Sequence, residues 1–517
     1  MSRRVTASVR PLVVAASAAA AIALVPLAYL VVRVSEAGPA QVLAGLMRER
    51  TWQTTATSLA LAAAVVVCCL IIGLPMAWIL ARTNLPRAGV WLVIASLPLA
   101  IPSYVAAYAW LAQFPGMHGF WAATVILTLV SLPYVVLPVA ASLRSIDPAL
   151  EETARSLGRG PTRAVIEATL PQAWPAAAAG SLLVALYVLS DFGAVALFRV
   201  DAFSRVIYAT YRASFDRTGA AVLALVLVAL AAILVLAERR VRGRGLRYRV
   251  SSGAVRQPNL VRLPVPGLIA ALVLLTTVAI AAIGVPIASL LLRMIQGSRR
   301  PLDPAELVNA LMASAGVALL GALIAVALAL PVAALAARSR SRATMAIETA
   351  AYAGHALPGV VVGLALVFLT LGVLPMAYQT LATLAFAYAV LFMPKSIGSS
   401  RAAIASVPPV IEQTARSLGR SAVSAWSATT ARLAWPGIAA GGLLVLLTAM
   451  KELPATLMLR PTGLDTLATE LWSRTEVAAY GAAAPYALAL IALAAVPAWL
   501  LSAAMQRTRS NADAVPG

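Results

Sequence analysis

Long apolar stretches separated by short polar segments run through the whole chain. A helix needs about 20 apolar residues to cross a bilayer, and twelve stretches of this kind can be placed along the sequence. They cover roughly 11–33, 54–80, 88–112, 119–143, 176–198, 219–237, 265–292, 308–337, 346–371, 376–394, 437–459 and 484–505. The pattern predicts an all-α membrane protein with about twelve transmembrane helices.

The composition excludes an ordinary soluble enzyme. The 517 residues are 61% hydrophobic and only 11% charged, whereas soluble domains carry about 25% charged residues. The formal net charge of +21 would suggest a nucleic-acid partner in a soluble protein. Here the basic residues form short clusters between apolar runs, which is typical of cytoplasmic loops. We therefore expect the protein to contact membrane lipid and no nucleic acid.

The distribution of basic residues predicts the orientation. Of the 40 Lys and Arg residues, 27 fall in one alternating set of polar segments, which includes both termini, and 11 in the other set. Because cytoplasmic loops carry the excess of Lys and Arg, both termini are expected in the cytoplasm.

An internal repeat divides the chain. Residues 151–159 read EETARSLGR and residues 412–420 read EQTARSLGR, which match at eight of nine positions at an offset of 261. The same offset pairs Trp174 with Trp435, Gly180 with Gly441 and Asp191 with Glu452, while an offset of 256 pairs Pro75 with Pro331, Arg82 with Arg338 and Pro102 with Pro358. The repeat predicts two parallel six-helix halves: residues 1–240, a basic linker 241–262, and residues 263–517.

The repeated polar segment, 147–171 in the first half and 408–432 in the second, has the signals of ordered structure. We call these segments the first loop and the second loop. In the first loop, Asp147 can cap a helix that begins at Pro148, and Gly158 permits a left-handed turn. A second short helix is expected from Pro161 towards Thr169, ending at Pro171. Two symmetric projections of this kind suit a symmetric partner.

The first loop resembles the EAA loop of the membrane-spanning subunits of bacterial ATP-binding-cassette importers. That motif reads Glu-Ala-Ala, three residues, Gly, nine residues, Ile, one residue and Leu-Pro. Glu152, Ala154, Gly158, Leu170 and Pro171 are in register with it, preceded by Glu151, while Thr153 and Ala168 depart.

The second loop departs further from the motif. It keeps Ala415 and Gly419, but Gln413 takes the acidic position, with Glu412 one residue earlier. Ala431 and Arg432 replace Leu-Pro. The resemblance makes both loops contact sites for an ATPase, and the degraded second copy indicates unequal coupling.

Two further runs resemble the ferric-iron importer permeases, which are similarly fused: PMAWILARTNLP at 75–86 and LPATLMLRPTG at 453–463. The resemblance implies a non-catalytic permease subunit of the bacterial inner membrane. It implies two copies of a cytoplasmic ATPase, which bind the ATP and Mg²⁺, and a periplasmic or lipid-anchored binding protein. Ferric iron is the favoured cargo, with thiamine, polyamine, sulfate and phosphonate as alternatives.

We expect no catalytic, cofactor or metal site in this chain. It lacks a Gly-x-x-x-x-Gly-Lys-[Ser/Thr] phosphate loop. The adjacent Cys68 and Cys69 lie within an apolar run, and the two histidines, His118 and His355, are far apart. A membrane-embedded enzyme would need a cluster of reactive side chains that the sequence does not contain.

Three ionisable residues in predicted spans are candidates for the translocation pathway. Asp191 lies in the fifth span, and Lys451 and Glu452 lie at the matching place in the eleventh. Such residues are costly in a membrane and indicate function by default, although a structural pair at a helix end is the competing interpretation. Asp191-Phe192-Gly193 and Pro454 can each break the helix locally. A twelve-helix secondary transporter would need acidic relays, for which only Asp191 and Glu452 qualify.

The orientation can be checked by chemical labelling. A single cysteine placed within 241–262, in a background without Cys68 and Cys69, should react with an impermeant thiol reagent only after the membrane is opened. A cysteine within 199–218 should react in intact cells. Labelling of the 241–262 cysteine from outside would refute the orientation.

Overall fold

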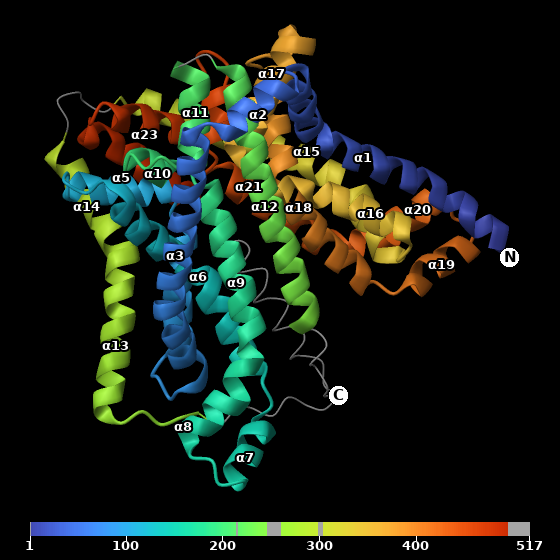
Figure 1. Ribbon diagram of the computed structural model, residues 1–517. Coiled ribbons are helices and arrows are strands. Elements are labelled where there is room, and N and C mark those ends of the chain that lie inside the picture. The colour runs from blue at the N-terminus through green and yellow to red at the C-terminus, as the bar shows by residue number, and fades with distance from the viewer. Residues whose placement is uncertain (1, 214–215, 246–259, 298–302, 495–517) are drawn as a thin grey trace. The chain divides into compact units, whose positions relative to one another are not determined.

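The computed structural model describes residues 2–213, 216–245, 260–297 and 303–494, and these are almost entirely helical (Figure 1). Within these residues, nine helices are long and apolar enough to cross a membrane, or eleven if each of two bent helix pairs counts as one span. The helix Tyr480–Ala494 begins the predicted twelfth span, whose remainder lies outside the described residues. The all-α membrane fold is thus confirmed.

The chain forms two compact units. One consists of residues 43–297, and the other of residues 1–42 and 298–517. These units differ from the predicted halves, 1–240 and 263–517, because the first long helix of each half belongs to the unit of the other half. Residues 246–259 of the predicted linker lie outside the described residues.

In the unit 43–297, three long helices pack together: α3 (Glu49–Arg82), α6 (Gly119–Ser145) and α9 (Leu170–Ser190) (Figure 1). The other helices of this unit are α4 (Ala88–Ser96), η1 (Leu97–Ala100), α5 (Ser103–Gln113), α7 (Pro148–Ser156), α8 (Pro161–Ala164), η2 (Val165–Thr169), α10 (Gly193–Leu197), α11 (Phe203–Ala213), α12 (Arg217–Gly245), α13 (Val265–Ala279), η4 (Ile280–Gly284) and α14 (Val285–Gln296). The Ser289 hydroxyl donates to the Ala109 carbonyl at 2.7 Å, which attaches α14 to α5.

In the other unit, α15 (Pro304–Arg338), α18 (Leu381–Ser406) and α21 (Arg432–Ala449) form the matching trio. The remaining helices are α1 (Ser2–Glu36), α16 (Arg342–Ala351), η5 (Tyr352–Ala356), α17 (Gly359–Val373), η6 (Pro375–Ala377), α19 (Pro409–Ser417), α20 (Ala422–Trp426), η7 (Ser427–Ala431), α22 (Pro454–Leu459) and α23 (Leu467–Glu476); α2 (Pro39–Met47) crosses the boundary of the two units. Alanines of α1 pack in one core cluster with α15 and α18, which explains why α1 belongs to this unit.

A repeated glycine allows the central helices to approach closely. A β-carbon at Gly180 of α9 would lie 2.5 Å from the Tyr134 carbonyl oxygen of α6. At Gly441 of α21 it would lie 3.1 Å from the Ser399 side chain of α18. Small residues at helix contacts are a main source of packing between membrane helices, so the repeat preserves this contact in both units.

The predicted third and ninth spans are not straight. Each is a pair of helices bent by about a right angle, 91° between Ala88–Ala100 and Ser103–Gln113 and 94° between Arg342–Gly354 and Gly359–Val373. Ile101 and Leu357 at the bends both have ψ near 117°, and each precedes a proline, which disfavours the helical conformation. The tenth span also differs from the prediction, because α18 continues to Ser406 and takes Lys395 into its interior.

Candidate functional site: two repeated loops and two helix breaks

The first loop forms the predicted angled projection. α7 and α8 extend beyond the ends of α3 and α6 (Figure 1). The Asp147 carboxylate caps α7 by accepting from the Ala149 amide at 3.0 Å. Gly158 has φ +82°, and the Arg159 amide then donates to the Ala154 carbonyl at 3.1 Å, which closes the helix end in the way typical of glycine-terminated helices.

The second loop has the same backbone despite its weaker motif. α19 ends at a turn in which Gly419 has φ +86°, and the Arg420 amide donates to the Ala415 carbonyl at 3.3 Å. The sequence prediction that a helix stops at Pro171 was wrong. A π-helical turn, η2 or η7, instead joins each loop to the following long helix. Because the second loop has Arg432 in place of Pro171, the proline is not the cause of this turn.

Glu151 and Glu152, although adjacent, have different environments. The Glu151 carboxylate is paired with Arg82 at the end of α3, and their side chains are 16% and 2% exposed. The Thr169 hydroxyl lies 3.3 Å from the same carboxylate. Glu152 is exposed at the loop surface. Glu151 therefore holds the loop against α3, while Glu152 is accessible to a partner.

The second loop repeats only part of this network. The Thr430 hydroxyl lies 3.2 Å from the Glu412 carboxylate, so Glu412 is the equivalent of Glu151, and the exposed Gln413 stands for Glu152. Arg338, the repeat partner of Arg82, donates instead to the Val407 carbonyl at 3.0 Å. The buried ion pair thus belongs to the first loop.

Both loops present apolar side chains that the motif comparison did not include. Leu157 and Leu418, just before the two glycines, are 77% and 80% exposed. The same leucine is thus exposed beside the glycine turn of both loops. Of the other predicted contacts, Ala154 and Ala415 are half-buried, whereas Leu170 and Pro171 are exposed at the start of α9. The sequence signal for Leu157 was its place within an otherwise polar segment.

The predicted helix breaks are present at both repeat positions. α9 ends at Ser190, and α10 begins at Gly193. The Asp191 carboxylate caps the new helix by accepting from the amides of Ala194 at 3.0 Å and Val195 at 3.3 Å. It also accepts from the Ser103 hydroxyl, which attaches the break to the start of α5, just after the bend at Pro102.

Glu452 plays the same part in the other unit. Its carboxylate accepts from the amides of Ala455 at 3.1 Å and Thr456 at 3.3 Å, at the start of α22. A β-carbon at Gly359, the first residue of α17, would collide with this carboxylate, so α17 begins directly beside the break. Lys451 lies in the same turn, next to Glu452. The two acids thus satisfy backbone groups that the broken helices leave free.

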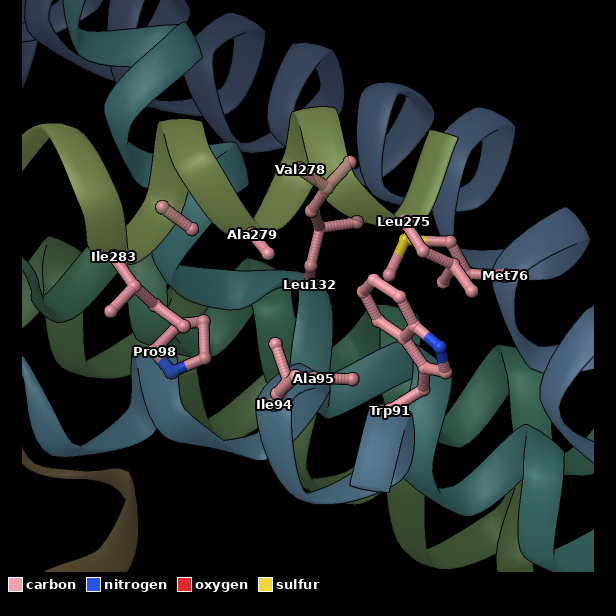
Figure 2. A pocket seen from close by; sticks show the side chains of 11 residues that line it. Met76, Trp91, Ile94, Ala95, Pro98, Leu132, Leu275, Val278, Ala279 and Ile283 are labelled. Atoms are coloured by element: carbon pink, nitrogen blue, oxygen red, sulfur yellow. The ribbon is translucent and has the colours of Figure 1, made fainter. Parts of the chain in front are cut away.

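No group of three or more His, Cys, Asp or Glu residues is placed to hold a metal in the described part of the chain. The His355 side chain lies outside the described residues. Figure 2 shows a crevice between α4 and α13 whose lining, which includes Met76, Trp91, Leu132 and Leu275, is apolar.

Comparison with known proteins agrees with this geometry. Residues 70–244, which contain the first loop and the first break, match the family described as binding-protein-dependent transport system inner membrane component. The chain is 33% identical to the Fe(3+)-transport system permease protein FbpB 2 of Haemophilus influenzae, over 92% of this chain and 94% of that protein.

Other relatives match about a third of this chain. The molybdenum transport system permease protein ModB of Escherichia coli is 28% identical over 37% of this chain and 93% of its own length. The sulfate transport system permease protein CysT of the same species is 28% identical over 34% of this chain and 70% of its own. With two loops, two breaks and a full-length relative, the chain belongs to the family of inner membrane permeases of binding-protein-dependent, ATP-binding-cassette importers.

Proposed function

We propose that this permease imports ferric iron. The observation that carries the proposal is the 33% identity to an Fe(3+)-transport permease over nearly the whole of both chains, whereas the molybdenum and sulfate permeases match about a third of this chain. Two copies of a cytoplasmic ATPase bind the loops, and a binding protein delivers the cargo on the opposite side. Both termini lie in the cytoplasm, as the 27-to-11 distribution of basic residues supports.

The two loops would transmit movement of the ATPase to the membrane helices. The exposed Leu157 and Glu152 offer an apolar contact and a charge to the partner. Arg82 and Thr169 hold the same loop to α3 and α9 through Glu151. A displacement of the loop would therefore move both helices together. This arrangement supports alternating access driven by ATP hydrolysis in the partner subunits.

Transport assays test the proposed cargo and energy source. Reconstituted in liposomes with its ATPase and binding protein, the permease should take up ferric iron only with ATP, and collapse of the proton gradient should leave the rate unchanged. The permease alone should hydrolyse no ATP. Uptake by the chain alone under a pH gradient would instead establish a secondary transporter, and ATP-dependent uptake of thiamine, polyamine, phosphonate or sulfate without iron would refute the cargo.

Substitution of the loop glycines tests docking. Both residues have positive φ, where a β-carbon costs about 1–2 kcal/mol, and both face open space. Gly158→Trp should reduce co-purification of the ATPase more than Gly419→Trp, because the first loop matches the motif better and Glu152 has no acidic counterpart at Gln413. The measurement is the ATPase-to-permease ratio at matched expression.

Gly116→Trp is the matched control for these variants. Gly116 is exposed, faces open space and lies beyond the other end of α6. This variant should retain the ATPase. Full recovery with both loop variants would contradict docking, whereas equal loss with both would leave docking intact and remove the asymmetry.

The buried ion pair should matter more than its counterpart in the second loop. Arg82→Met leaves the Glu151 carboxylate without its cation, and removing one partner of a buried pair costs about 3–5 kcal/mol. The melting temperature and the coupling of ATP hydrolysis to transport should therefore both fall. Arg338→Met, which removes one hydrogen bond to a carbonyl, should have a smaller effect. Equal melting temperatures for the two variants would contradict this role of the pair.

The combined variant Arg82→Met with Glu151→Gln separates stability from coupling. Because it removes both charges, it should recover much of the lost stability. Its coupling should remain low if the ion pair transmits movement. Recovery of coupling together with stability would show that the pair serves folding alone.

A further inference from the structure

A lysine lies in the middle of a membrane helix. Lys395 is 14 residues after the start of α18 at Leu381 and 11 residues before its end at Ser406. Lys395 is therefore in the interior of a helix that is long and apolar enough to cross a membrane. An ionisable group within such a helix is expensive and marks a functional site by default.

The surroundings of Lys395 are polar without being acidic. Its ammonium group donates to the Thr448 hydroxyl on α21 at 2.7 Å and lies 5.3 Å from the centre of the Phe392 ring. No carboxylate in the part of the chain that the structure describes forms an ion pair with it. Its charge is therefore not compensated by an acid there.

A second lysine lies one helical turn after the residue that Lys395 contacts. Lys451 follows Thr448, the hydrogen-bond partner of Lys395, by three residues, about one helical turn, at the break between α21 and α22. Lys395, Thr448 and Lys451 are called the lysine cluster below. The neighbouring Glu452 carboxylate accepts from the amides at the start of α22, so it serves the backbone of that helix.

The first half of the chain carries uncharged residues at the positions of the lysine cluster. At the offset of 261, Tyr134, Tyr187 and Ser190 occupy the positions of Lys395, Thr448 and Lys451. The rings of Tyr134 and Tyr187 are in contact, with centroids 5.7 Å apart. Each unit therefore carries hydroxyl or ammonium donors at these positions, and the second half alone carries charge. An aromatic or hydroxyl pair suffices to join the helices, so the lysines are not required for packing.

We propose that the lysine cluster contacts the cargo, and that the cargo passes it as an anion. The ligand presents negatively charged oxygens, either as a free oxyanion or as the anionic ligands of a ferric complex. Charge-assisted N–H···O hydrogen bonds to such oxygens are among the strongest that lysine makes. A bare trivalent cation beside two ammonium groups would be repelled, and strongly so in a low-dielectric interior. The inference rests on the proposed import of iron and specifies the chemical form of the cargo.

Uptake assays on lysine variants test this inference. The permease, reconstituted with its ATPase and binding protein, is supplied with ferric phosphate, ferric citrate or molybdate. Lys395→Met and Lys451→Met should each lower uptake of the transported anion by about 10- to 100-fold, the effect of one lost charged hydrogen bond. Lys395→Arg should retain most of the rate, whereas Lys395→Gln, which keeps a donor for Thr448, should lose as much as Lys395→Met.

Arg401→Gln is the matched control, because Arg401 is an exposed cation on the same helix, paired with Glu348. It should transport at the wild-type rate, and the recovery of assembled transporter should be equal for all variants. If Lys395→Met fails to assemble, Lys395→Gln compared with Lys395→Arg gives the same answer.

The outcomes separate the two proposals. Wild-type uptake of molybdate without either iron complex would refute the iron cargo, and a lysine-dependent rate would still support the anionic form. Wild-type uptake of iron with unchanged rates in Lys395→Met and Lys451→Met would overturn the lysine cluster and leave the iron cargo intact. Faster iron uptake in these variants would also overturn it, since the lysines would then repel a cation.

Discussion

A broken helix inside an apolar medium must find partners for the backbone groups that the break sets free. In both units a carboxylate accepts the freed amides, while a hydroxyl, of Ser204 or Thr456, donates to the carbonyl at the break. Asp191 and Glu452 accept amides at the start of α10 and α22, so each break has one defined geometry. The following short helix packs beside α5 or α17, each of which starts just after a right-angle bend. The bent span and the broken span of a unit therefore depend on the same acid.

These long-range contacts explain why the spans could be predicted from the sequence and the bends could not. Apolar length predicted the spans, and the repeat predicted that Asp191 and Glu452 have equivalent places. Proline alone could not predict the bends, because Pro75, Pro331 and Pro394 lie inside continuous helices, whereas Pro102 and Pro358 begin new ones. The difference lies in tertiary packing, since the irregular backbone at each bend is tolerated where protein surrounds it.

In the loops, too, features set by neighbouring residues could be predicted, whereas features set by residues far away in the sequence could not. The caps and glycine turns follow from residues within the loop, such as Asp147 and Gly158, and could be predicted. The separate roles of Glu151 and Glu152 could not, because they depend on Arg82, 69 residues earlier. The predicted end of the tenth span at 394 was wrong for a similar reason. The polar stretch of Ser, Gly and Arg that follows Lys395 favours the end of a span, but the helix continues to Ser406.

In each half, one helix connects the loop to the break. In the first half, α9 runs without interruption for 21 residues from Leu170 to Ser190, roughly 30 Å at about 1.5 Å per residue. Its N-terminal end follows Thr169, which contacts Glu151. Its C-terminal end precedes Asp191, whose carboxylate accepts a hydrogen bond from the Ala194 amide. Under the proposed coupling, a continuous helix attached at both ends would carry a displacement of the loop to the break. A π-helical turn, a feature often found at functional sites, joins this helix to the first loop.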